Sequence, residues 1–190
     1  MSEQITETQI VSNTGETFIF RGLLSEDGEL LGRFFEGLSK QTCARFGPHP
    51  LTCQYAFQLC ANLEGGDTVR FVIASQAEIV GYFILDFNVS EHEVSRYDEL
   101  SISLDAKTDP VFAPCIADKY QNRGLASQAM ERIIAYARGR KLRSLVLMGG
   151  TQEPNTLARR FYTKFGFREY AHFYTDYNGL NNIDMMLTLS

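Results

Sequence analysis

The sequence has 190 residues, of which 44% are hydrophobic and 22% are charged, and its formal net charge is −5. This composition excludes a disordered chain and fits one globular domain that buries a core of its own. No apolar run reaches the ~18 residues that a membrane-spanning helix needs, so we expect no membrane partner.

The first part of the chain predicts one strand and two helices. Alternation in ETFIFRGLL (residues 16–24) is typical of an edge strand. Apolar residues at helical spacing then predict a helix that Ser25 caps and that ends before Gly47. A second apolar face with the same spacing predicts another helix over residues 53–63.

The middle of the chain predicts a β-hairpin and then a polar segment. VRFVIAS (69–75) and IVGYFILDF (79–87) are two strands joined by a short turn. Residues 88–108 are polar, and ELSISL (99–104) within them alternates like an extra strand. An excursion of this length in a compact domain is often functional.

The last part of the chain predicts alternating strands and helices. VFAPCIA (111–117) is a strand that Pro114 interrupts, because proline has no amide hydrogen and therefore implies a bulge or an unpaired edge. The elements after it are a helix from Gly124 to Arg138, the strand SLVLM (144–148), a helix from Asn155 to Phe165, and the strands FREYAHFYT (167–175) and NIDMMLTL (182–189).

A glycine turn joins the strand that ends near Ile116 to the helix that begins near Gly124. The first four amides of a helix have no partner within it, and the helix dipole adds partial positive charge, so this turn is suited to an anion. Gly124 and the small Ala126 let the anion approach, while Gln121 and Arg123 add donors at the rim. The glycine patterns of a P-loop and of a dinucleotide-binding fold are both absent from the sequence.

Two motifs here resemble those of the GNAT superfamily of acyl-CoA-dependent N-acyltransferases. QNRGLA (Gln121 to Ala126) matches the family's Q/R-x-x-G-x-G/A pyrophosphate-binding motif. NTLARRFYTKFGF (Asn155 to Phe167) is similar to its N-x-x-A-x-x-[FL]-Y-x-K-x-G-F helix. The resemblance covers residues 110–168, and upstream it rests on the order of elements and the hairpin.

The resemblance implies an α/β fold, with a single domain, a central mixed β-sheet, a splayed and bulged strand, and about four flanking helices. It divides residues 1–190 into an acceptor-side half (1–109), an acyl-CoA-binding core (110–168) and C-terminal strands (169–190). It also implies an N-acetyltransferase that transfers an acetyl group from acetyl-CoA to a primary amine by direct attack. The alternatives are a non-catalytic acyl-CoA-binding sensor or scaffold of the same fold and an interaction protein that kept the fold but lost the cofactor.

The two motifs carry the family's site residues over to this sequence. The splayed strand would offer backbone groups of Ile116 and Ala117 to the pantetheine arm and to an oxyanion. Tyr162 would be the catalytic general acid that protonates the departing CoA sulfur. The residues implied for cofactor binding are Ile116, Ala117, Gln121, Asn122, Arg123, Gly124, Leu125, Ala126, Asn155 and Tyr162.

Plainer interpretations of two of these residues stay open. Tyr162 could be a packed aromatic side chain whose hydroxyl has a structural hydrogen bond. Asn155 could be simply a helix cap. It could also cap the helix and contact the cofactor at the same time.

One departure from the family concerns the general base. Many members have a glutamate near the start of the bulged strand, where this sequence has Pro110. The alternatives, acting through a water molecule, are Asp109, Glu99, Glu153 and Asp118. Without a positioned base we expect an acceptor of low pKa, such as an α-amine.

The charges are unevenly distributed along the chain. Residues 119–168 contain eleven of the 18 Lys and Arg residues but only two of the 23 acidic ones, which gives this segment +9 and the rest −14. The segment would attract a polyanion, although a solvated basic face explains it equally well. No interleaved aromatic residues or dedicated basic helix accompany it, so we expect no nucleic-acid partner.

The remaining expectations concern metals, compartment and partners. His49, His92 and His172 are scattered without ligand spacing, which predicts no metal site. Four cysteines without a C-x-x-C pair, and no apolar signal segment at the start, predict reduced thiols in the cytoplasm. The expected partners are acetyl-CoA as acyl donor and an amine acceptor, either a small molecule or a protein, and a homodimer stays an open alternative.

Overall fold

One mixed β-sheet runs through the structure, a computed structural model that describes residues 5–63, 66–176 and 179–189. Its strands are β1 (Thr8–Val11), β2 (Thr17–Gly22), β3 (Thr68–Ala74), β4 (Ile79–Asp86), β5 (Val111–Ile116), β6 (Ser144–Gln152), β7 (Arg168–Thr175) and β8 (Leu180–Thr188). They are hydrogen-bonded in the order β1-β2-β3-β4-β5-β6-β8-β7. Every neighbouring pair is antiparallel except β5 with β6.

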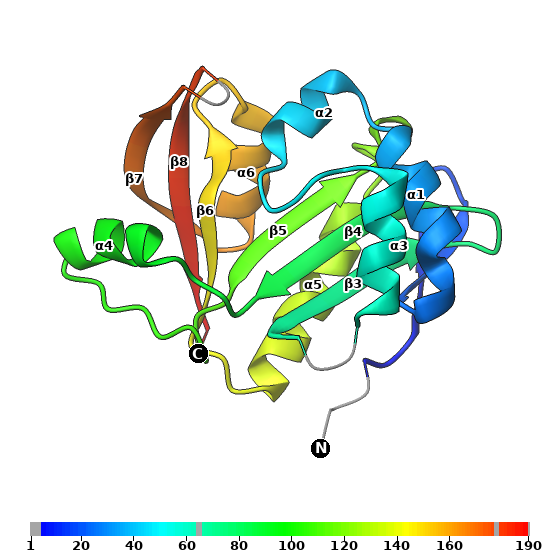
Figure 1. Cartoon of the computed structure of the whole chain (residues 1–190), viewed down its shortest axis with the longest axis horizontal. Coiled ribbons are helices and arrows are strands. Elements are labelled where there is room, and N and C mark those ends of the chain that lie inside the picture. Colours follow the sequence, from blue (N-terminus) through cyan, green and yellow to red (C-terminus); the bar gives the residue numbers. More distant parts are fainter. Residues whose placement is uncertain (1–4, 64–65, 177–178, 190) are drawn as a thin grey trace.

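Helices cover both faces of this sheet (Figure 1). The described residues form α1 (Gly28–Glu36), α2 (Lys40–Arg45), α3 (Cys53–Ala61), α4 (Glu91–Glu99), α5 (Leu125–Gly139) and α6 (Thr156–Lys164). Leu31 of α1 belongs to the core on one face, and Ile133 of α5 and Tyr162 of α6 belong to the core on the other. The expected α/β fold with a mixed sheet is confirmed, with six helices among these residues. None of the six is long and apolar enough to cross a membrane.

β5 and β6 are parallel neighbours that separate toward their carboxyl ends. β5 pairs with β4 along all six of its residues, but with β6 only where Val111 faces Val146. β6 bulges between Leu147 and Thr151, and Gly149 within the bulge has a φ of 59°, which glycine tolerates. The expected splayed strand is therefore β5, and the bulge lies in its neighbour β6.

The ladder between β4 and β5 continues through Pro114 without a change of register, so Pro114 causes no bulge. The amide of Ala117 donates to the carbonyl of Val80 at 2.9 Å. Because hydrogen-bonded and non-hydrogen-bonded pairs alternate in an antiparallel ladder, Pro114 and Ile116 direct their backbone groups away from β4. The missing amide hydrogen of Pro114 therefore costs no bond to β4, and the amide of Ile116 faces the opening between β5 and β6.

The N-terminal half differs from expectation at three places. The edge strand is β1, which was not predicted, and the strand predicted for the edge is β2, the second in order. The single helix expected from Ser25 to Gly47 is two helices, because the chain breaks at Gly37 and restarts at Ser39, whose side chain caps α2. Ser25 opens a one-turn 3-10 helix instead, and α1 begins after Asp27.

The strand expected at residues 99–104 is also wrong, because the segment 88–108 contains the helix α4 and then an irregular connection to β5. Tyr97 of α4 is fully buried. Arg96 forms an ion pair with Asp184 of β8 at 3.1 Å. Asp184 lies far from α4 in the sequence, so the local pattern did not reveal the helix.

Candidate active site

The turn between β5 and α5 forms a cradle of backbone amides at a helix N-terminus. Asn122 and Gly124 have φ of 60° and 80°, and such left-handed residues turn successive N–H groups toward one side. Within the described part of the chain, no group accepts a hydrogen bond from the amides of Asn122, Arg123 or Gly124. The first turn of α5 adds its own free amides, so the cradle fits a diphosphate.

The turn between β1 and β2 lies directly against this cradle. The amide of Asn13 donates to the carbonyl of Arg123 at 2.9 Å, and a Cβ atom at Gly124 would lie 2.6 Å from Oδ1 of Asn13. Glycine is therefore favoured here by its positive φ, and any side chain at this position would also displace that of Asn13. Asn13 was not predicted, because no local pattern connects it with a turn more than a hundred residues away.

The basic side chains of the turn are paired with acidic residues from the N-terminal half. Arg123 contacts Glu16 at 2.7 Å, and Lys119 contacts Glu78 at 2.7 Å. Arg123 also lies over the ring of Tyr120, with 5.1 Å between its Cζ atom and the ring centroid. The positive charge is thus partly neutralised, and the backbone amides are the donors that are free to meet an anion.

A cavity of about 470 Å³, which we call the turn cavity, includes the cradle and reaches the opening between β5 and β6. The residues expected to bind the cofactor that line it are Ile116, Gln121, Asn122, Arg123, Gly124, Ala126, Asn155 and Tyr162. Ala117 and Leu125 lie outside its wall. Leu125 is fully buried in the core, and the amide of Ala117 is already bound by β4, so it is not free for a ligand.

Asn155 and Tyr162 of the second motif belong to the wall of the turn cavity. The side chain of Asn155 caps α6 by accepting from the amide of Ala158 at 3.4 Å, so the cap and the cavity wall are the same residue. Tyr162 is 5% exposed, and its hydroxyl makes no hydrogen bond with any residue that the structure describes. Burial, with a smaller contribution from Cys115, raises the pKa of Tyr162, which keeps it protonated at neutral pH.

A second cavity of about 810 Å³, the wide cavity, shares part of its wall with the turn cavity. The shared residues are Arg45, Phe46, Pro114 and Gly150. The segment 88–108 contributes Asn88, Ser90, His92 and Arg96 to the wide cavity. In Figure 1, α2 lies near the carboxyl end of β5 and α4 near the other end. Two ligands, one in each cavity, would meet where β5 and β6 separate.

The four alternative bases, Asp109, Glu99, Glu153 and Asp118, line neither cavity. Asp109 is 1% exposed, forms an ion pair with Arg143 and accepts from the hydroxyl of Ser144 at 2.6 Å. Burial alone would raise the pKa of Asp109, but the hydrogen bonds from Arg143 and Ser144 outweigh it and lower the pKa. Asp109 precedes β5 at the end opposite Ile116, and its contacts with Arg143 and Ser144 connect this end of β5 to the start of β6.

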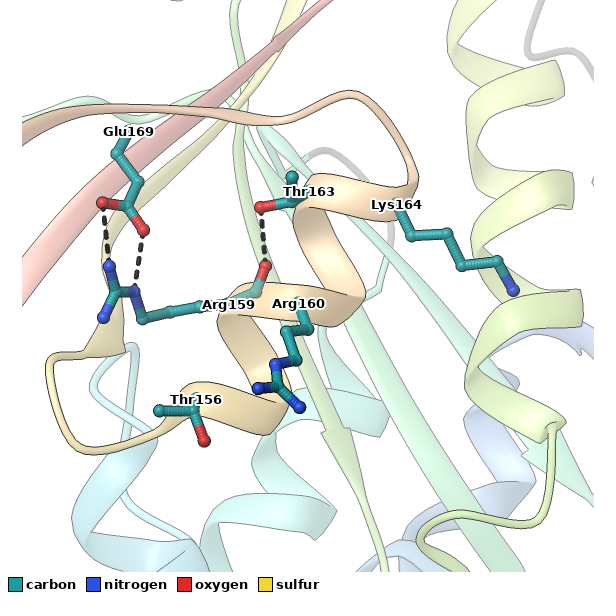
Figure 2. A pocket seen from close by; sticks show the side chains of 6 residues that line it. All are labelled: Thr156, Arg159, Arg160, Thr163, Lys164 and Glu169. Carbon is teal, nitrogen blue, oxygen red and sulfur yellow. Dashed lines mark hydrogen bonds and ion pairs between the residues drawn. The ribbon is translucent and has the colours of Figure 1, made fainter.

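A hollow beside α6, whose lining residues Figure 2 draws, shares no described lining residue with either cavity. Its lining residues are Thr156, Arg159, Arg160, Thr163, Lys164 and Glu169. Nε and Nη2 of Arg159 donate to the carboxylate of Glu169 at 2.7 and 3.2 Å, which ties α6 to β7. None of the residues implied for cofactor binding lines this hollow, and we assign it no ligand.

No cluster of His, Cys, Asp and Glu suited to a metal ion occurs among residues 5–63, 66–176 and 179–189. The three histidines lie in three different places. His49 Nε2 is 3.1 Å from the hydroxyl of Tyr82, His92 lines the wide cavity, and His172 contacts Glu169 at 3.4 Å.

Comparison with known proteins gives one family. The model of the acetyltransferase (GNAT) family matches residues 29–167. No curated protein matches the sequence at a significant level.

Solved structures of the same fold cover nearly the whole chain. RimJ from Mycobacterium smegmatis, in complex with CoA-disulfide, is 16% identical with a TM-score of 0.71, over 96% of this chain and 86% of that chain. The GNAT domain of PAT from S. lividans is 22% identical with a TM-score of 0.70, over 95% and 97%. The ribosomal-protein-S5-alanine acetyltransferase from Vibrio fischeri is 14% identical with a TM-score of 0.70, over 97% of both chains. At these sequence identities the structural similarity shows that the fold is shared.

Proposed function

The chain belongs to the acetyltransferase (GNAT) family, and on this premise we propose that it is an N-acetyltransferase that transfers an acetyl group from acetyl-CoA to a primary amine. The observation that carries the proposal is the shared wall at Pro114 and Gly150, where the turn cavity meets the wide cavity. A donor in the first and an acceptor in the second would place their reacting atoms together, which supplies the proximity that direct transfer needs.

Different groups of the turn cavity would bind successive parts of acetyl-CoA. The amides of Asn122, Arg123 and Gly124, with those of the first turn of α5, would hold the diphosphate. The backbone carbonyl of Pro114 faces the opening between β5 and β6, where it would accept from an amide of the pantetheine arm. The structure of RimJ, which has the same fold, is a complex with CoA-disulfide, and this supports a CoA compound as the ligand.

The proposed reaction is direct attack on the thioester. The nitrogen of an uncharged amine bonds to the carbonyl carbon, and the amide of Ile116 donates to the developing oxyanion. The C–S bond then breaks, and Tyr162 gives its proton to the departing thiolate while the proton of the attacking nitrogen passes to water, from which Tyr162 is reprotonated. Cys115 is not needed as a nucleophile, because burial raises its pKa to about 12 and disfavours the thiolate.

An amine of low pKa is the acceptor that this arrangement favours. The four carboxylates considered as bases lie outside both cavities. An α-amine, with a reference pKa of about 7.7–8.0, is partly uncharged at neutral pH without a base. Two structures of the same fold are named as alanine acetyltransferases of ribosomal proteins S5 and S18, which supports the terminal amine of a protein or peptide.

The alternative is an acyl-CoA sensor or scaffold, and the lack of a carboxylate base at the shared wall favours it. One experiment separates the two functions. Acetyl-CoA is titrated by calorimetry, and CoA release is then followed with a thiol reagent in the presence of peptides with free N-termini, lysine and spermidine. Release with any amine supports the enzyme, tight binding without release supports the sensor, and absence of binding contradicts both.

A further inference from the structure

The side-chain oxygen of Gln152 is a buried acceptor without a hydrogen-bond partner among the described residues. Gln152 is 2% exposed and stands at the end of β6, in the wall of the wide cavity. Its Nε2 atom donates to the carbonyl of Gly149 at 3.2 Å. Because the oxygen cannot donate this hydrogen bond, the contact determines which end of the side-chain amide is the oxygen. An unpaired buried acceptor disfavours folding, so its place at a cavity wall indicates that a ligand supplies the donor.

Gln152 lies next to the junction of the two cavities. Gly150, two residues earlier, lines both of them. The backbone carbonyl of Gln152 accepts from the amide of Asn155 at 2.8 Å, and Asn155 lines the turn cavity. The backbone of Gln152 is thus tied to the turn cavity, while Gln152 is itself a lining residue of the wide cavity.

The wide cavity has little net charge for its size. Among its described lining residues, Asp86 is the one carboxylate, and Arg45 and Arg96 are the cations. The charge of Arg96 is balanced by Asp184 at 3.1 Å. A polycation would find one carboxylate in this wall, so an uncharged chain with a single amine matches the wall better.

We infer that Gln152 binds the attacking amine of the acceptor through Oε1, and that this amine belongs to an otherwise uncharged chain, such as a neutral peptide with a free N-terminus. The inference rests on the proposed function. An uncharged primary amine has two N–H groups and one lone pair, so a bond from one N–H to Oε1 orients the lone pair toward the thioester. Being an amide, Gln152 accepts this hydrogen bond and takes no proton.

The test compares three neutral peptides that begin with Ala, Ser or Gly, and spermidine as a polycation, by release of CoA. Gln152→Met removes the oxygen at similar size, and kcat/KM for the best peptide should fall about tenfold or more. Its affinity for acetyl-CoA, measured by calorimetry, should not change. Gln152→Glu keeps an acceptor but favours the charged ammonium, so its rate should reach the plateau at higher pH than the wild type. Gln58→Met, at an exposed position of α3, is the matched control and should behave as the wild type.

The possible results test the inference, the neutral acceptor and the proposed function separately. An unchanged kcat/KM and pH profile in folded Gln152→Met overturns the inference and leaves the proposed function intact. Faster acetylation of spermidine than of every peptide overturns the neutral acceptor. If the wild type binds acetyl-CoA but acetylates no amine, the proposed function is wrong and the inference falls with it.

Discussion

The carboxylate of Asp184 accepts a hydrogen bond of 2.6 Å from the backbone amide of Gly149 in the bulge of β6. The same carboxylate is fully buried and is bound by Arg96 of α4 at 3.1 and 3.4 Å. The guanidinium of Arg96 lies 4.2 Å from the ring centroid of Phe173. One side chain therefore fixes two walls of the wide cavity, the bulge where the sheet opens and the helix that was not predicted.

Asp184→Asn should destabilise the protein strongly. The change leaves the mostly buried charge of Arg96 without its counterion, which typically costs about 3–5 kcal/mol of the free energy of unfolding. Urea unfolding measures this loss. Because the residues are partners, Asp184→Asn combined with Arg96→Met should cost less than the sum of the single changes. Strictly additive losses would show that the ion pair is not coupled.

Tyr162→Phe should slow turnover without destabilising the fold. The hydroxyl has no partner among the described residues, so its removal leaves no protein group unsatisfied. Loss of a general acid typically costs ~10²- to 10⁴-fold in rate. We expect the low end, because a thiol with a pKa of about 8.5 leaves fairly well unaided. Measuring kcat together with the melting temperature separates the two effects, and full turnover would show that the hydroxyl is not the acid.

Gly124→Val should weaken the binding of acetyl-CoA severely, by about tenfold or more, which corresponds to about 1.4 kcal/mol. The new side chain is strained at a φ of 80°, so the turn that carries the cradle amides must change, and its Cβ would also displace the side chain of Asn13, whose Oδ1 would lie at 2.6 Å. Gly15→Val is a matched control, since its φ is 87° and no atom lies within 4 Å of its Cβ position. Calorimetry should find normal affinity in the control. Normal affinity in a folded Gly124→Val protein would show that the cradle does not bind acetyl-CoA.

The features of the site that the sequence predicted depend on local backbone chemistry. The glycine turn at Gly124 and the helix cap at Asn155 are set by residues a few positions away, so each motif can be recognised in a short stretch of sequence. The same is true of the helices and strands that surround these two motifs. The family resemblance then added a role for Tyr162, which stays a prediction.

The features that the sequence did not predict depend on pairing between distant segments. ELSISL alternates like a strand, but α4 is held by the contact of Arg96 with β8, and residues 99–104 belong to none of the strands that the structure describes. Asp109, named as an alternative base, faces Arg143 only because the chain returns as β6. The unpaired oxygen of Gln152 likewise becomes visible only when the cavity wall is assembled.

Asp109→Asn should lower stability and leave the pH dependence of turnover unchanged. Its hydrogen bonds from Arg143 and Ser144 keep the pKa of Asp109 below the ordinary value of 3.8, so the stability it contributes is present above that pH and is lost on acidification. We expect a loss of about 2–3 kcal/mol at pH 7. The free energy of unfolding should also fall less steeply below about pH 5 than in the wild type. A shift in the pH dependence of kcat/KM in this variant would show that Asp109 acts as a base.

The pH dependence of turnover should report the acceptor itself. A lysine-type amine has a reference pKa of about 10.4 and an α-amine about 7.7–8.0, a gap of about 2.5 units. At about 1.36 kcal/mol per unit, an enzyme without a positioned base loses roughly 3–4 kcal/mol more on the lysine-type amine. With a peptide acceptor, kcat/KM should therefore rise with pH and level off near the pKa of its α-amine. Asp86 is the carboxylate in the described wall of the wide cavity, so Asp86→Asn tests whether a carboxylate there acts as the base. If a lysine-type amine is acetylated rapidly at pH 7 and Asp86→Asn abolishes that rate, a base operates and the low-pKa acceptor is wrong.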